Sequence, residues 1–103
     1  MSEIRNAVIK STKLGKEDHG VMTFMIHLEY DCAGQGFGGY VLGGEFGIAA
    51  IAGVLKIAGV SNWEDLRGRP VRADATNNKV CRLGHYLKDE WLDLEELAQE
   101  FQP

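Results

Sequence analysis

The sequence is poor in cysteine and proline, with two of each in 103 residues, and its three histidines are scattered. Two cysteines, Cys32 and Cys81, make no disulfide framework, and neither lies beside a second cysteine or an obvious base. We therefore expect two free thiols without a catalytic role. The scattered histidines argue against a structural zinc site, and we expect no metal.

Excess positive charge and long apolar runs are also missing. The net charge of −4 argues against a protein that wraps a nucleic acid polymer. We find no stretch of about 20 apolar residues, and the charged amino terminus is not typical of a signal peptide. We expect a cytoplasmic protein with no membrane partner, folded as a single domain over residues 1–103.

Recognisable catalytic groups are lacking as well. His19 follows Asp18 in a predicted turn, but no GxSxG motif or other nucleophile accompanies them. The adjacent acids Glu95 and Glu96 fall in the first turn of a predicted helix, where they stabilise its dipole. We therefore expect a binding protein that is not an enzyme and needs no cofactor.

Glycine, by contrast, is abundant, and it is concentrated in the segment GQGFGGY at residues 34–40. Four glycines around two aromatic rings predict a loop with accessible backbone N–H groups that could dock a flat, anionic ligand. The candidate ligand contacts are Gln35, Gly36, Phe37 and Gly38. The spacing fits neither GxGxxG nor a P-loop, and a β-bulge or tight bend is the alternative.

The remaining pattern predicts an α+β fold, with an antiparallel β-sheet packed against one apolar helix and a short C-terminal helix. The sheet consists of a meander plus a second hairpin. Its predicted strands cover residues 4–14, 21–30, 37–42, 70–75 and 79–83, the last two joined by a turn at 76–78. Gly59 ends the long helix, Ser61 and Glu64 predict a capping box, and Asp93 caps the last helix.

The helix predicted at residues 45–58 is apolar on nearly every side. Ile48, Ile51, Leu55 and Ala58 share one face, and most of the remaining positions are apolar too. One small sheet can cover only one side of such a helix. We therefore expect a dimer or higher homo-oligomer.

Basic residues gather between positions 67 and 88, where six lysines and arginines accompany one acid, Asp74. Such a patch on an acidic protein suits a compact phosphorylated metabolite, and a solvated face with scattered ion pairs is the alternative. We expect Arg72 to point outward from its strand. Its removal should then weaken ligand binding and leave folding almost unchanged.

Several motifs together carry a resemblance to a known family. They are KSTKLG at 10–15, EDHG at 17–20, GQGFGGY at 34–40, WEDL at 63–66, VR at 71–72 and LKDEW at 87–91. In this order they cover most of the chain. The sequence resembles a family of small phage and prophage proteins and, within it, the first family of Thoeris anti-defence proteins.

The resemblance implies a protein that sequesters a cyclic ADP-ribose isomer, the signal of TIR-domain immune enzymes, and releases it unaltered. Some members also hold cyclic oligonucleotides. Their pockets lie between subunits, where an aromatic ring and a cation sandwich the base. Lys88 and Asp89 resemble the cation and acid of that arrangement, and Arg72 falls in the matching strand.

The resemblance leaves some site residues open. Phe37 and Trp63 are both candidates for the stacking ring, and Arg82 and His85 are weaker ligand candidates. The connection at residues 42–45 is shorter than in the family, which puts contacts made by that loop in doubt. The alternative function is a phage inhibitor that binds a host protein, such as an anti-CRISPR.

Overall fold

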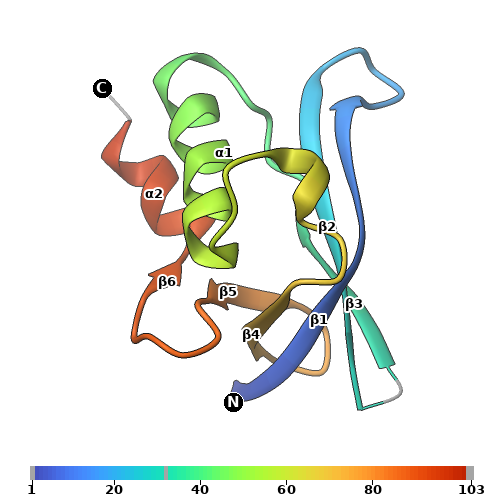
Figure 1. Ribbon diagram of the computed structural model, residues 1–103. Helices are drawn as coiled ribbons and strands as arrows, with labels where there is room; N and C mark the ends of the chain where they lie inside the picture. Colours follow the sequence, from blue (N-terminus) through green and yellow to red (C-terminus); the bar gives the residue numbers. More distant parts are fainter. Residues whose placement is uncertain (1, 32, 102–103) are drawn as a thin grey trace.

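The computed structural model describes residues 2–31 and 33–101, which form a six-stranded antiparallel sheet with helices on one face (Figure 1). The strand order is β3-β2-β1-β4-β5-β6. This arrangement confirms the predicted α+β fold with a meander and a second hairpin. In chain order the elements are β1 (Glu3–Lys16), β2 (Met22–Tyr30), β3 (Ala33–Gly38), α1 (Gly44–Ala58), η1 (Trp63–Asp65), β4 (Pro70–Ala75), β5 (Val80–Gly84), β6 (Trp91–Leu92) and α2 (Leu94–Glu100).

The long strand β1 joins the two halves of the sheet. Its first part pairs with β4, from Glu3 opposite Ala75 to Val8 opposite Pro70. Its second part pairs with β2, and the register shifts between Ile9 and Ser11. Such an irregularity bends a strand and increases its twist. The meander and the β4–β5 hairpin consequently cross at an angle in Figure 1.

The third strand lies earlier in the chain than the sequence pattern predicts. It covers Ala33–Gly38 instead of residues 37–42, so most of the glycine-rich segment is strand and not loop. Tyr30 pairs with Ala33, which leaves a two-residue connection, and Asp31 adopts a φ of 50° there. The turn therefore precedes the glycines, and a non-glycine residue supplies its left-handed conformation.

Helix α1 packs on the sheet through a stripe of small and β-branched side chains. The buried positions are Gly47, Ala50, Val54, Ile57 and Ala58, which differs from the face expected around Ile48. Ile48 is 72% exposed, and the other exposed helix positions are Gly44, Glu45, Ala52 and Lys56. The outward side is thus less apolar than the sequence suggested, and it gives a weaker reason for oligomerisation than we expected.

The segment Gly44–Asp65 is long and apolar enough to cross a membrane by length and composition, which corrects our expectation that no such run exists. Gly59, at a φ of 72°, ends α1 after 15 residues, as the sequence predicted. A helix of that length spans about 22 Å, less than the roughly 30 Å of a bilayer core. A core helix passes the same composition test, so the finding alone does not indicate a membrane protein.

The predicted helix caps have mixed outcomes. The Asp93 side chain accepts a hydrogen bond from the Glu96 N–H, as expected for the N-cap of α2. The capping box at Ser61 is wrong, because Asn62 occupies the N-cap position of η1 and makes no side-chain cap hydrogen bond there. With only three residues, η1 offers little for a capping box to stabilise.

Candidate functional site

The glycines of the GQGFGGY segment are explained by close packing within the sheet. A Cβ atom on Gly36 would lie 2.7 Å from the Met25 sulfur, and one on Gly34 would lie 3.3 Å from the Leu28 carbonyl oxygen. Gly38 has a φ of 128°, and a Cβ there would collide with the Phe24 carbonyl oxygen. These contacts favour a structural role for the glycines, the alternative that the sequence left open.

The side chains between these glycines are also engaged. Phe37 is 3% exposed and belongs to the hydrophobic core, which corrects the expectation of an unhindered ring. Gln35 accepts a hydrogen bond from the Tyr30 hydroxyl and donates to the carbonyls of Thr76 and Asn77, at 3.2 and 3.1 Å. Gln35 therefore ties the edge strand β3 to the β4–β5 turn.

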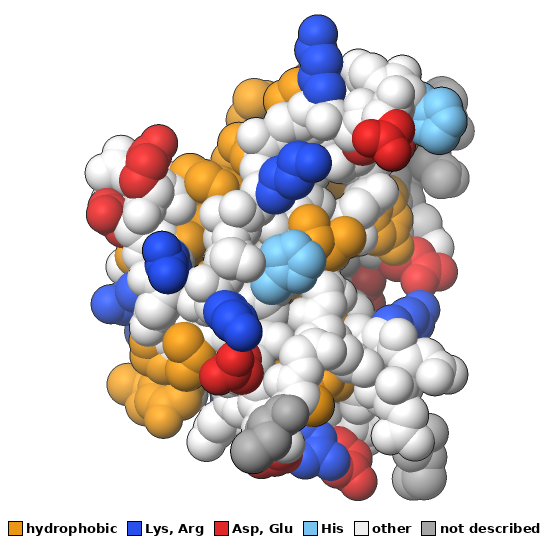
Figure 2. All heavy atoms as spheres, turned by 90° about the vertical axis from the view of Figure 1, so that its right-hand side faces the viewer, with side chains coloured by type: hydrophobic (Ala, Val, Ile, Leu, Met, Phe, Trp, Pro, Cys, Tyr) orange, Lys and Arg blue, Asp and Glu red, His pale blue; other side chains and the backbone are white. Residues whose placement is uncertain are grey.

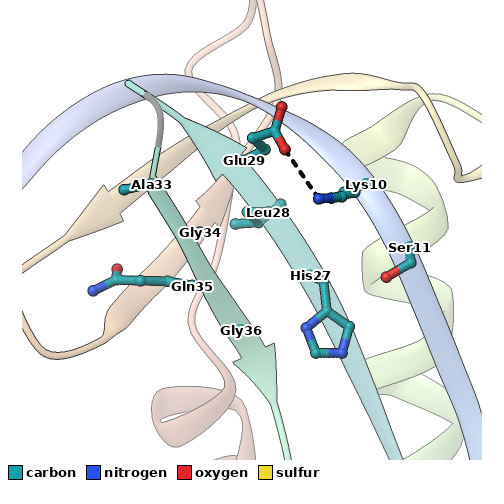
Figure 3. A pocket seen from close by; sticks show the side chains of 9 residues that line it. All are labelled: Lys10, Ser11, His27, Leu28, Glu29, Ala33, Gly34, Gln35 and Gly36. Carbon is teal, nitrogen blue, oxygen red and sulfur yellow. Dashed lines mark ion pairs between the residues drawn. The ribbon is translucent and has the colours of Figure 1, made fainter.

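An open hollow of about 700 Å³ lies over the outer side of β1, β2 and β3 (Figure 3). Gly34 and Gly36 form part of its lining, and the ion pair Lys10–Glu29 crosses its margin at 3.4 Å. Figure 3 shows His27 projecting over the strands, while Gln35 points away from it. Figure 2 shows basic and acidic side chains interspersed over this side of the molecule, not a field of one sign.

A second group of polar side chains surrounds Trp91 on β6. The guanidinium carbons of Arg72 and Arg82 lie 4.8 and 4.4 Å from the centroid of the Trp91 ring. The ring packs on the backbone of Gly84, where a Cβ would lie 2.5 Å from a ring carbon. The indole N–H donates to the Asp89 carboxylate at 2.9 Å. We call Arg72, Arg82, Lys88, Asp89 and Trp91 the tryptophan cluster.

Arg72 connects this cluster to the loop between β5 and β6. Its Nε donates to the His85 carbonyl at 2.8 Å, and its Nη2 donates to the Lys88 carbonyl at 2.6 Å. Arg72 was expected to point outward with almost no effect on folding, whereas the structure shows it half-buried and hydrogen-bonded to this loop. The Lys88 side chain is exposed, and its backbone is held in place by Arg72.

Arg82 reaches from the same ring to a buried acid. Its Nε donates to Asp74 at 2.8 Å, and the Asp74 side chain is 11% exposed. Burial opposes the ionisation of Asp74, but hydrogen bonds from Ser2 and Arg82 and the charge of Arg82 outweigh it. The pKa of Asp74 consequently lies below its ordinary value. Asp74 neutralises part of the positive charge that the sequence assigned to a ligand.

The structure thus divides the predicted site residues into separate groups. Three of them, Arg72, Arg82 and Asp89, contact Trp91, and the backbone carbonyl of Lys88 accepts a hydrogen bond from Arg72. Gln35, Gly36, Phe37 and Gly38 lie on β3, and Trp63 lies on η1. The Trp63 indole donates to the Thr12 hydroxyl at 3.0 Å and its ring lies 5.5 Å from that of Phe24, so it packs at the edge of the core.

Trp91 is the residue that the sequence reasoning missed. It was not among the candidate ligand contacts, although it belongs to the LKDEW motif. In the structure it is the aromatic ring that lies among the predicted cations. The available signal was the combination of an aromatic residue with Lys88 and Asp89 in one short motif.

The hollow beside the tryptophan cluster is small and carries acids. It measures about 290 Å³, and Arg82 and Trp91 share its lining with Asp93, Glu96 and Glu100. Small-molecule sites usually occupy about 300–1,000 Å³ and bury most of the ligand. A single chain therefore offers a platform of cations and one ring, and not an enclosed nucleotide pocket.

Two further findings bear on chemistry. Among residues 2–31 and 33–101, no group of three or more histidine, cysteine or acidic side chains could hold a metal ion. Cys81 is a half-buried free thiol, whereas Cys32 lies outside the described residues.

A scan against family models and a search of the curated proteins found no match to this chain.

Proposed function

We propose that this protein binds a cyclic ADP-ribose isomer and sequesters it without degrading it. Bound in this way, the signal would be withdrawn from a host immune response, as the resemblance to the Thoeris anti-defence family implies. The observation that supports the proposal is the tryptophan cluster, in which two arginines and an acid that the sequence had singled out surround one aromatic ring, while Lys88 is joined to them through its backbone carbonyl.

The chemistry of the cluster suits the two ends of such a ligand. Arginine guanidinium groups form strong hydrogen bonds with phosphate oxygens, and both Arg72 and Arg82 keep N–H groups that make no hydrogen bond within residues 2–31 and 33–101. A purine base can stack on an aromatic or guanidinium plane, which contributes about 1–3 kcal/mol per base. No bond in the ligand needs to break for this recognition.

We further propose that a second copy of the chain completes the site. The hollow at the cluster is too small and too open for a dinucleotide-sized ligand, and its acids would repel phosphate on that side. A neighbouring subunit could cover the platform and supply the missing contacts. The proposed assembly is a dimer or a higher homo-oligomer.

The function is tested by titrating the purified protein with a panel of cyclic ADP-ribose isomers and cyclic di- and trinucleotides in a calorimeter. We expect at least one cyclic ADP-ribose isomer to bind. Arg72→Lys is a suitable variant, because it keeps the charge but loses the planar fork, and we expect it to bind more weakly. Binding of equal strength in Arg72→Lys and the wild type would exclude Arg72 from phosphate recognition.

The second candidate is an inhibitor that binds a host protein. Leu87 is 82% exposed at the tip of a loop whose backbone accepts a hydrogen bond from Arg72 and donates hydrogen bonds to the His85 ring. A rigid loop that presents an apolar side chain is a common way to engage a protein partner. Co-purification with a host protein that Leu87→Ser abolishes, without any nucleotide-dependent thermal shift, would support this alternative.

A further inference from the structure

The ring of His85 holds the loop that carries Lys88 and Asp89. Its Nδ1 atom lies 3.0 Å from the backbone nitrogens of both Leu87 and Lys88. Both backbone groups are donors, so the ring nitrogen between them must be the acceptor. The ring proton is then on Nε2, and the imidazole is neutral.

No other protein group accepts from these two N–H groups within residues 2–31 and 33–101. The N–H groups of Leu87 and Lys88 have no further partner there, while the loop is closed by the pair from His85 N–H to the Glu90 carbonyl at 2.9 Å. Arg72 approaches the same loop from β4 and donates to the carbonyls of His85 and Lys88. Arg72 thus donates to the carbonyl groups of this short segment, and the His85 ring accepts from its N–H groups.

We propose that His85 is a positioning residue, whose Nδ1 atom folds the 85–90 loop so that Lys88 and Asp89 are presented beside Arg72 and Trp91. It acts through the loop and does not contact the ligand. The consequence for binding rests on the proposed function, but the folding of the loop requires no ligand.

The geometry resembles the turn in which an asparagine or aspartate side chain accepts from the N–H groups two and three residues further along the chain. The Oδ1 atom of asparagine is separated from Cα by the same number of bonds as Nδ1 of histidine. The Oε1 atom of glutamine is one bond further away. His85→Asn should therefore preserve the loop, and His85→Gln should not.

The first experiment uses the ligand-free protein. In ¹⁵N-labelled wild type at pH 7.5, NMR should show an unprotonated Nδ1 and a protonated Nε2 for His85. Hydrogen exchange at Leu87 and Lys88 should be about tenfold faster in His85→Gln and almost unchanged in His85→Asn. A wild-type ring protonated at Nδ1, or equal protection in His85→Gln, would overturn the proposal.

The second experiment measures the affinity of the same variants for each cyclic ADP-ribose isomer that the wild type binds. His85→Gln should bind about tenfold more weakly, and His85→Asn should match the wild type. If His85→Gln loses amide protection but keeps full affinity, the positioning role is wrong. If the wild type binds no isomer, the proposed function fails, while the NMR and exchange results still decide the role of His85 in the loop.

Discussion

Replacing Arg72 with alanine should destabilise the protein as well as weaken ligand binding. Arg72 joins three parts of the structure. The residue lies on β4, and its guanidinium group donates to two carbonyls of the β5–β6 loop and packs against Trp91. Alanine would leave the His85 and Lys88 carbonyls without this donor. It would also remove a cation from the Trp91 ring.

The magnitude follows from the exposure of each contact. The half-buried hydrogen bond to His85 should contribute about 1.5 kcal/mol, the low end for a charged donor, and the exposed bond to Lys88 about 0.5 kcal/mol. A cation–π contact at a half-exposed site adds roughly 0.5–1 kcal/mol. We expect a loss of about 2–3 kcal/mol in the free energy of unfolding, or a Tm lower by about 10–20 °C.

Urea unfolding followed by tryptophan fluorescence measures this change directly. Arg67→Ala is the matched control, because Arg67 is exposed and makes no side-chain hydrogen bond or ion pair within residues 2–31 and 33–101. It should change stability by less than about 0.5 kcal/mol. Equal stability of the two variants would refute the structural role of Arg72 and support the original expectation that its removal leaves folding almost unchanged.

Three further outcomes follow from the fold. Phe37→Ala should lower the free energy of unfolding by about 3–5 kcal/mol, because Phe37 is buried. Tyr40 is 38% exposed, so Tyr40→Ala should lower it clearly less. Similar losses for the two variants in urea unfolding would contradict the core position of Phe37. The pKa of Asp74 is lowered in the folded state, so its ionised form stabilises the protein fully above its unfolded pKa of about 3.9, and that stability is lost as the pH falls through the folded pKa. Asp74→Asn should therefore have a flatter acid limb in urea unfolding between pH 7 and 2, and an unchanged limb would show that Asp74 is not responsible. Light scattering at micromolar concentration should report a dimer or larger assembly, and a monodisperse monomer would remove the second copy from the proposed site.

Local patterns in the sequence predicted much of the fold. The strand predicted at residues 21–30 corresponds to β2, in which the alternating apolar residues Phe24, Ile26 and Leu28 are buried. Gly59 and Asp93 marked a helix end and a helix start correctly, because each acts through its own backbone or side chain. Signals of this kind depend on neighbouring residues alone and can therefore be recognised in one sequence.

The position of β3 could not be predicted in the same way. Its turn has Asp31 in the left-handed position, where a glycine would usually mark the turn in a sequence. The glycines that follow are required by close contacts with residues of β2. These close contacts arise from the register between β2 and β3, in which His27 lies opposite Gly36. A pairing between strands determines this, and no local pattern shows it.

The candidate site was predicted in part. Basic residues between positions 67 and 88 were singled out as ligand candidates, and two of them, Arg72 and Arg82, lie over the Trp91 ring. Their engagement with backbone carbonyls and with Asp74 was not foreseen, because it depends on how β4, β5 and the following loop pack together. Composition indicates where charge is concentrated, but only the fold shows which charges are already paired.

The central claim is that the protein holds a nucleotide signal without altering it, and one measurement tests this most directly. The protein is incubated with each cyclic ADP-ribose isomer, separated from free ligand, heated to release what it holds, and the released material is identified by chromatography and mass spectrometry. We predict that at least one isomer is retained and recovered intact in stoichiometric amount, and that retention falls in Arg72→Lys. Failure to retain any isomer, or recovery of a cleaved product in proportion to the protein added, would contradict the account.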